Sequence, residues 1–200
     1  MVRSANDFID IIEEDTPKSV TVWLENTDLN KTYTCNSDES ICIPVGTYKI
    51  WAQSSNTPGA VDNTLMLRSP ILKLAKETSV ITTSSAKITL NLSYHCYAVF
   101  AMIDECSSCK AGNNSHAYTD FYKVGRYFVG YFKDSSVSVK LIPYSDSSEF
   151  AYTELTFVTS YTPGDVFAEF GKYYVVHPTK IDSTTSGFDV NMPTMEEGEI

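Results

Sequence analysis

Short runs of alternating hydrophobic and polar residues recur along most of the chain. In 19–24, for example, Val20, Val22 and Leu24 share one face, and Gly, Pro, Asn, Asp and Ser gather between such runs. Alternation with a period of two predicts half-buried β-strands, and the clusters between them predict turns. We therefore predict strands at 19–24, 31–35, 41–44, 48–53, 65–67, 71–74, 80–83, 87–92, 97–103, 121–132, 137–142, 154–158, 166–170, 173–176 and 188–191, bulges at Gly125 and Gly130, and a polar loop at 106–116.

The N-terminal stretch has a different pattern. Residues 5–15 carry five acidic residues around Phe8, Ile9, Ile11 and Ile12, and Thr16-Pro17 follows them. This spacing predicts either a short amphipathic helix or a loose lead-in strand that ends at the proline. We expect it to act as a solvated cover over a sheet edge.

Many short strands with turn residues between them indicate an all-β chain built of β-sandwiches. The runs 45–50 and 170–175 echo each other as Gly-x-Tyr-x-aliphatic. We predict two sandwich domains, at 18–92 and 93–195, with an acidic lead-in segment at 1–17 and a mobile acidic tail at 196–200. One larger sandwich is the alternative.

Composition and charge exclude several classes of protein. The formal net charge of −10 argues against binding to a phosphate backbone, so no nucleic-acid partner is expected. The apolar runs are too short to span a bilayer, so we predict no transmembrane segment. The first fifteen residues match no secretory signal.

The five cysteines allow at most two intrachain disulfides. Cys35 and Cys42 flank a predicted hairpin tip and are the candidate disulfide pair, whereas Cys96 lies in an apolar run and is expected in the core. Cys106 and Cys109, with His95 or His116, offer a zinc site or a redox pair as alternatives. A polar loop with free or locally bridged thiols is the favoured interpretation, because the second ligand pair of a zinc site is missing from the sequence. We expect no metal and no cofactor.

Catalytic motifs are missing from the sequence. It contains no Gly-x-Ser-x-Gly elbow, no phosphate-binding glycine loop and no EF-hand loop. The carboxylates at 134–136 and 146–149 leave a loop calcium site open as an alternative. We therefore predict that the protein is not an enzyme.

Two other groups of residues are candidates for binding. Tyr127 and Tyr131 share one parity in an aromatic run, opposite to Phe128 and Phe132, so we predict an exposed aromatic contact face at Tyr127 and Tyr131. Trp23 and Trp51 are expected in the core, with a carbohydrate-stacking platform as the alternative. Phe188 and Val190 alternate with polar residues and are candidates for contact between an edge strand and a partner, the alternative being an ordinary last strand.

Several short motifs resemble the fimbrillin-like families of Bacteroidetes cell-surface proteins and lipoproteins. The family pattern Pro-x-Gly-x-Tyr-x-x-x-Ala is matched by Pro44, Gly46, Tyr48 and Ala52, and a later strand motif by Cys96, Ala98 and an offset Val99. The resemblance implies two tandem Greek-key β-sandwiches of the transthyretin-like type. Its relatives are fimbrial shaft, anchor or tip subunits, and the polymerising members exchange a strand between subunits.

The resulting functional prediction is a non-enzymatic cell-surface protein, acting in adhesion or fimbrial assembly through strand-edge contacts with protein partners or identical subunits. A surface location requires an export or lipoprotein signal that these 200 residues do not contain. Two alternatives stay open. One is a bacteriophage virion decoration or fibre protein, and the other is a carbohydrate-binding surface module with glycans as partners.

Overall fold

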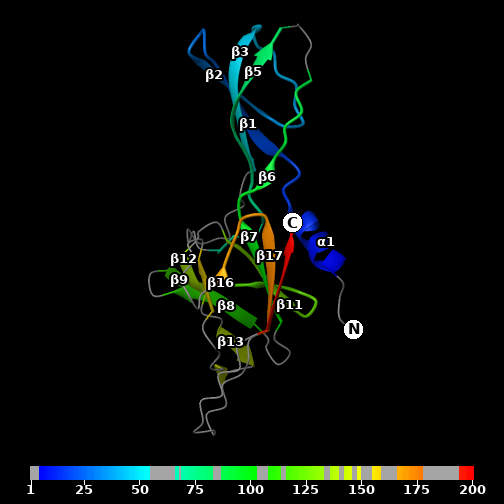
Figure 1. Cartoon of the computed structure of the whole chain (residues 1–200), viewed down its shortest axis with the longest axis vertical. Coiled ribbons are helices and arrows are strands. Elements are labelled where there is room, and N and C mark those ends of the chain that lie inside the picture. The colour runs from blue at the N-terminus through cyan, green and yellow to red at the C-terminus, as the bar shows by residue number, and fades with distance from the viewer. Residues whose placement is uncertain are drawn as a thin grey trace.

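The computed structural model of the chain describes the backbone of residues 5–54, 66–67, 69–82, 87–102, 108–113, 116–132, 136–139, 142–145, 148–149, 155–158, 166–177 and 194–200, and only part of their side chains. The described elements are one short helix and many strands, which confirms an all-β chain (Figure 1). They are α1 (Ala5–Asp15), β1 (Val20–Asn26), β2 (Lys31–Asn36), β3 (Gly46–Ser54), β4 (Met66–Leu67), β5 (Leu72–Ile81), β6 (Ser93–Tyr94), β7 (Tyr97–Met102), β8 (Ser108–Asn113), β9 (His116–Asp120), β10 (Tyr122–Val124), β11 (Tyr127–Phe132), β12 (Ser136–Val139), β13 (Ile142–Ser145), β14 (Ser148–Glu149), β15 (Leu155–Val158), β16 (Val166–Phe167), β17 (Lys172–His177) and β18 (Thr194–Glu199).

The first half of the chain forms a five-stranded sheet with the order β2-β1-β3-β5-β6, which we call the N-terminal sheet. Its strands are antiparallel, and β1 lies opposite β3 over its whole length. The alternation seen in the sequence puts Val20, Val22 and Leu24 on one face, where they form a core with Tyr48 and Ile50. The alternate residues of β1 and β3, among them Thr21, Glu25, Lys49 and Gln53, lie on the other face.

A second sheet, the C-terminal sheet, has the order β10-β11-β7-β17-β18, and β4 also pairs with β11. Strands β7 and β17 run parallel, and the other pairs are antiparallel. Every residue of β11 is buried, as are the first five of β7. A strand that is buried on both faces reads as a continuous apolar run, which explains the aromatic stretch of β11. Two smaller sheets, β12-β15-β16 and β14-β13-β8-β9, complete the described strands.

Helix α1 confirms the helical alternative for residues 5–15, but it is more than an edge cover. Its apolar side chains Phe8, Ile11 and Ile12 belong to the core of the C-terminal sheet. The Phe8 ring lies 4.9 Å from that of Phe100 and 5.1 Å from that of Tyr127, centroid to centroid. Burial of such a ring stabilises the fold by about 1.5–3 kcal/mol. The predicted lead-in segment is therefore part of the second core, although it comes first in the sequence.

Several strand predictions need correction. The runs 71–74 and 80–83 are parts of one strand, β5, whose charged middle lies exposed. The run 121–132 is a hairpin of β10 and β11, with Gly125 in the turn at φ 61°, a conformation that suits glycine. The predicted polar loop 106–116 contains β8 and the start of β9. Residues 41–44 and 87–92 are extended but form no ladder with another described strand.

The acidic tail is a strand, so the prediction of a mobile tail is wrong. Residues 194–199 form β18, which pairs with β17 and places Gly198 opposite Tyr173. The Tyr173 ring occupies the space that a side chain at position 198 would need. Lys172 Nζ lies 3.8 Å from Glu199 Oε1 and 4.0 Å from Glu197 Oε1. One lysine therefore offsets part of the repulsion between the carboxylates of the tail. Main-chain pairing and this charge pattern hold the tail against the sheet.

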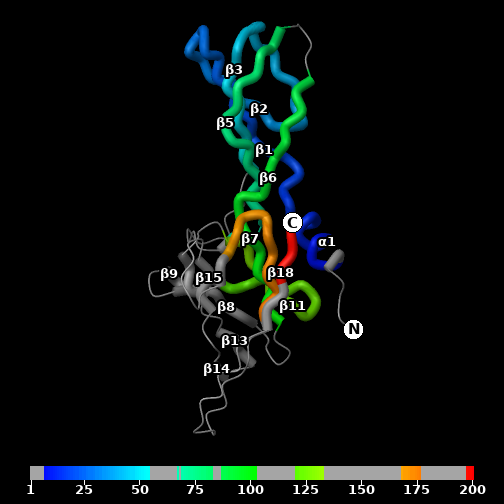
Figure 2. The backbone as a smooth tube through the Cα atoms, in the orientation of Figure 1, coloured from blue at the N-terminus to red at the C-terminus, as the bar shows by residue number. Residues whose placement is uncertain are grey.

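The two sheets share segments of chain, because residues from before position 92 also lie in the core of the C-terminal sheet. Leu67 and Ile71 come from the first half of the chain but lie in the core of the C-terminal sheet. The amide of His95 donates to the Ile71 carbonyl at 2.7 Å, which joins the two crossing segments between the sheets. Figure 2 follows these crossings along the narrow middle of the molecule. The tandem Greek-key arrangement and the domain limits at 18–92 and 93–195 stay predictions.

Candidate strand-binding groove

The apolar face of the N-terminal sheet opens into a groove with a cavity volume of about 730 Å³. Its floor consists of branched side chains from three neighbouring strands. They are Val22 and Leu24 of β1, Ile50 of β3 and Ile81 of β5, each of them less than 9% exposed. Alternation within each strand brings these side chains to one face, so the sequence itself makes the floor apolar.

Two extended segments, which we call the rims, line the groove together with this floor. The first is 41–45 and the second is 87–90. In both rims a half-buried apolar residue alternates with an exposed one: Ile41 and Ile43 face the groove side, and Ile88 and Leu90 do so in the other segment. Both rims thus have the pattern of strands.

The rims nevertheless take part in no described ladder. Within the described part of the chain, residues 41–44 and 87–92 belong to no sheet, and their backbone groups exchange no hydrogen bond with another backbone segment. Unpaired N–H and C=O groups along an extended segment form a template for pairing with another strand. Among the described residues, the groove therefore combines an apolar floor with two edges that belong to no ladder.

A tyrosine hydrogen bond holds the first rim in place. The hydroxyl of Tyr48, which is fully buried, donates to the carbonyl oxygen of Pro44 at 2.6 Å. Gly46 lies between them, and a Cβ added there would lie 3.0 Å from Nδ2 of Asn26. The Pro-x-Gly-x-Tyr motif therefore has a structural role, since it turns the chain from the rim into β3.

The predicted disulfide is not formed. Cys35 and Cys42 both line the groove, but both are free thiols. Burial, and then the negative charge of Glu39, raise the pKa of Cys35, so this thiol stays protonated. Cys96 is buried, as expected, and its sulfur accepts a hydrogen bond from the Ile71 amide at 3.3 Å. Burial raises the pKa of Cys96 to about 11, which makes it an inert core residue.

The prediction of an exposed aromatic face at Tyr127 and Tyr131 is wrong. These side chains are 2% and 0% exposed. They lie on the face of the C-terminal sheet that helix α1 covers, and the opposite residues Phe128 and Phe132 are buried as well. Tyr127 and Tyr131 do share one face of β11, as the alternation in the sequence indicates, but both faces of the strand are covered.

The two tryptophans are not core residues. Trp23 and Trp51 lie on the face of the N-terminal sheet opposite the groove, where both are partly exposed. Their rings are stacked, with centroids 6.0 Å apart and planes 9° apart. Period-two alternation already separates Trp23 from Val22 and Leu24, so this placement was readable from the sequence.

Other candidate residues do not form a described site. Phe188, Val190 and Cys106 lie outside the described residues, and of Cys109 and His116 only the backbone is described. His95 packs against Phe170 at 4.6 Å between ring centroids, and burial, together with Lys73, lowers its pKa. Among the described side chains, no three His, Cys, Asp or Glu residues form a group that could hold a metal ion.

The groove was missed at the sequence level, although its signal was present. The alternation in 41–44 and 87–92 was interpreted as that of ordinary strands. Only the three-dimensional arrangement separates a strand that is paired from one that is not.

Helix α1 has 11 residues, and no helix in the described part of the chain is long and apolar enough to cross a bilayer.

No protein-family model and no curated protein matches the chain. The solved structures that are similar to it include two from Bacteroidetes. One is a protein of Bacteroides eggerthii DSM 20697 that is provisionally named a cell adhesion protein, with 11% identity over 92% of this chain and 90% of that chain and a TM-score of 0.47. The other is a fimbrial assembly protein of Parabacteroides distasonis ATCC 8503, with 15% identity over 81% of this chain and 83% of that chain and a TM-score of 0.39. The chain is thus similar to structures of Bacteroidetes proteins with these names, while its membership of the fimbrillin-like family stays a prediction.

Proposed function

We propose that the chain is a non-enzymatic cell-surface protein that acts in adhesion or fimbrial assembly by accepting a strand of a partner subunit. The observation that carries this proposal is the groove, with an apolar floor and two extended rims that pair with no described strand.

The groove suits an extended peptide better than a small molecule. A strand placed between the rims would satisfy their backbone groups, and its alternate side chains would bury against Val22, Leu24 and Ile50. Main-chain hydrogen bonds then provide affinity, and the apolar floor selects alternating hydrophobic residues. The lining residues include one acidic and one basic side chain, Glu39 and Lys87, so the floor dominates the recognition.

The proposed occupant is the segment 187–193 of a second copy of this chain. It contains Phe188, Val190 and Met192 at alternate positions, which is the pattern that a groove with an apolar floor requires. The exchange of identical segments between subunits gives head-to-tail contacts, and such contacts extend into a filament unless the rotation closes a ring.

A labelled peptide of residues 186–193 tests this proposal. We expect saturable binding to the full chain by fluorescence anisotropy, and loss of at least tenfold in affinity for Leu90→Lys, which puts a charge into the groove. Thr89→Lys is the matched control, because Thr89 is the exposed neighbour in the same rim and should leave binding unchanged. A peptide with Phe188→Ser and Val190→Ser should not bind. Equal binding by both rim variants, or no binding by wild type, would overturn the proposal.

A second candidate is a bacteriophage virion protein. Proteins that fold in a reducing cytosol keep their thiols reduced, so this candidate requires all five cysteines to be free in native material. Intact mass and N-terminal analysis of native material distinguish the two candidates. A processed or lipidated start supports the cell surface, and an unmodified start at Met1 with five reduced thiols supports the virion.

A further inference from the structure

The face of the N-terminal sheet opposite the groove has a separate set of aromatic and charged residues. Trp23 and Trp51 lie directly opposite each other in the β1–β3 register, and their parallel rings form a pair at the middle of this face. Aromatic side chains usually bury their area in a core. Here two indoles remain partly exposed at neighbouring positions, so this pair is the feature to explain.

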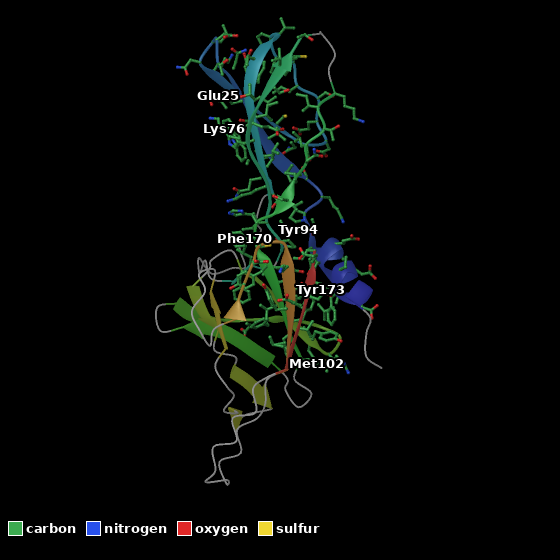
Figure 3. All side chains as sticks on the ribbon, viewed as in Figure 1. Glu25, Lys76, Tyr94, Met102, Phe170 and Tyr173 are labelled. Atoms are coloured by element: carbon green, nitrogen blue, oxygen red, sulfur yellow. The ribbon has the colours of Figure 1, made fainter. Side chains whose placement is uncertain are left out.

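A cation and an anion flank the tryptophan pair. Lys76 Nζ lies 4.4 Å from the ring centroid of Trp51 and forms an ion pair with Glu25 of β1. Figure 3 shows Lys76 and Glu25 next to each other on this sheet. Lys76 therefore reaches from β5 across β3 toward β1. Its side chain is still 48% exposed.

The residues next to the pair in the register are polar. Thr34 lies opposite Trp23 on β2, and Thr21 and Gln53 form the adjacent pair of β1 and β3. Glu25 and Lys49 form the pair on the other side. The two indoles are thus apolar surface surrounded by hydroxyl, amide and charged groups, each of which can form hydrogen bonds.

The charge of this face has the opposite sign to that of the whole chain. By strand parity, β1, β3 and β5 contribute Lys49, Lys73 and Lys76 to it, against the single acid Glu25. The chain as a whole has a formal net charge of −10. A local excess of lysines on an acidic protein favours anionic ligands at this face.

We propose that this face binds an acidic carbohydrate. A sugar ring has an apolar C–H side that packs against an indole, and hydroxyl groups around its edge that bond to residues such as Gln53 and Thr21. A carboxylate or sulfate on the sugar would pair with the lysines beside Trp51. A protein partner fits less well, because the core of a protein interface needs a larger continuous apolar area than two side chains provide.

The site is on the opposite face of the sheet from the groove and is independent of strand exchange. It can be followed by intrinsic fluorescence, because Trp23 and Trp51 are the two tryptophans of the chain. The full chain is titrated with a panel of acidic glycans (hyaluronan, polygalacturonate, alginate, chondroitin sulfate and sialyllactose) and with neutral maltohexaose, cellohexaose and xylohexaose. We expect a saturable change of tryptophan emission with at least one acidic glycan, weakened by added salt.

Three variants make the test specific. Trp51→Thr is expected to lower the affinity for the acidic glycan at least tenfold, and Lys76→Gln to lower it severalfold while removing the preference over neutral sugars. Val80→Thr is the matched control, since Val80 lies on the same strand as Lys76, is 62% exposed and should leave affinity unchanged. Far-UV circular dichroism confirms that each variant is folded.

Two results would overturn the proposal: no emission change and no binding across the acidic panel, or neutral and acidic sugars bound equally by wild type. Leu90→Lys, which blocks the groove, should bind the acidic glycan as wild type does. Glycan binding by this variant therefore distinguishes a failure of the strand-exchange proposal from a failure of the carbohydrate proposal.

Discussion

At the scale of the residue, the Pro-x-Gly-x-Tyr motif has a definable physical role. Tyr48 is fully buried, and its hydroxyl reaches back to the carbonyl oxygen of Pro44. The ring fills the core of the N-terminal sheet while the hydroxyl fixes the turn that leads out of the first rim. A motif that resembles a family signature is therefore explained by packing and one hydrogen bond, and it carries no chemistry of its own.

Tyr48→Phe should lower the free energy of unfolding by about 1 kcal/mol, because it removes the bond to Pro44 and keeps the ring. Urea denaturation measures this. Tyr33→Phe is the matched control: Tyr33 is half-buried on β2, its ring packs against that of Tyr48, and no hydrogen bond of its hydroxyl is described. The control should change stability by less than about 0.5 kcal/mol. Equal effects of the two substitutions would contradict the role assigned to the hydroxyl.

At the scale of the element, helix α1 is docked by apolar packing and by one polar contact at its C-terminal end. The Tyr131 hydroxyl donates to Asp15 Oδ2 at 2.5 Å, and it accepts a bond from the Tyr122 hydroxyl at 3.3 Å. Burial raises the pKa of Asp15 above its ordinary 3.8; the bond from Tyr131 opposes this shift, and Glu14 adds to it. Burial and the bond to Asp15 both raise the pKa of Tyr131, so its hydroxyl stays protonated as the donor.

The raised pKa of Asp15 gives a pH dependence with a definite sign. In the pH range between 3.8 and the raised value, the folded state binds more protons at Asp15 than the unfolded state does. The contribution of Asp15 to stability is therefore complete below pH 3.8 and is lost as the pH rises through its folded pKa. The free energy of unfolding of wild type minus that of Asp15→Asn should increase as the pH is lowered from 7 to 4.

Urea denaturation at several pH values checks this difference, because subtraction of the variant cancels the titration of the other carboxyl groups. Asp10→Asn is the matched control, since Asp10 is an exposed residue of the same helix. If the two substitutions give the same course with pH, the burial of Asp15 does not control the docking of the helix.

At the scale of the whole molecule, the crossing segments couple the two sheets. Ile71 lies in the core of the C-terminal sheet, while its neighbour Leu72 begins β5 of the N-terminal sheet. The Ile71 amide and carbonyl bond to Cys96 and His95, and Thr16 Oγ1 lies 3.2 Å from the Tyr94 hydroxyl. These contacts join three chain segments where the sheets meet, so neither core can lose its structure without exposing part of the other.

We therefore expect one cooperative unfolding transition for both sheets. The two tryptophans lie in the N-terminal sheet, so their emission follows that sheet, whereas near-UV circular dichroism also includes the clustered tyrosines and phenylalanines of the C-terminal core. In urea the two signals should give the same midpoint and the same slope. Midpoints that differ by more than the fitting error would show that the sheets unfold separately, as two independent sandwich domains would.

The sequence by itself determined the properties that depend on neighbours along the chain. Alternation located β1, β2 and β3, and composition indicated an all-β fold. The spacing of Phe8, Ile11 and Ile12 allowed a short helix or a lead-in strand, and the helix formed. These signals are local, because the backbone of a strand or helix sets which residues share a face.

The tertiary structure alone decided what each face meets. Tyr127 and Tyr131 lie on the face of β11 opposite to Phe128 and Phe132. They are buried because helix α1, more than a hundred residues earlier in the sequence, covers that face. The segment 87–92 has the alternation of a strand, but it forms no ladder with any described strand. Such pairings join segments distant in sequence, and periodicity holds no information about them. The groove and the tail strand β18 therefore emerged only from the folded chain.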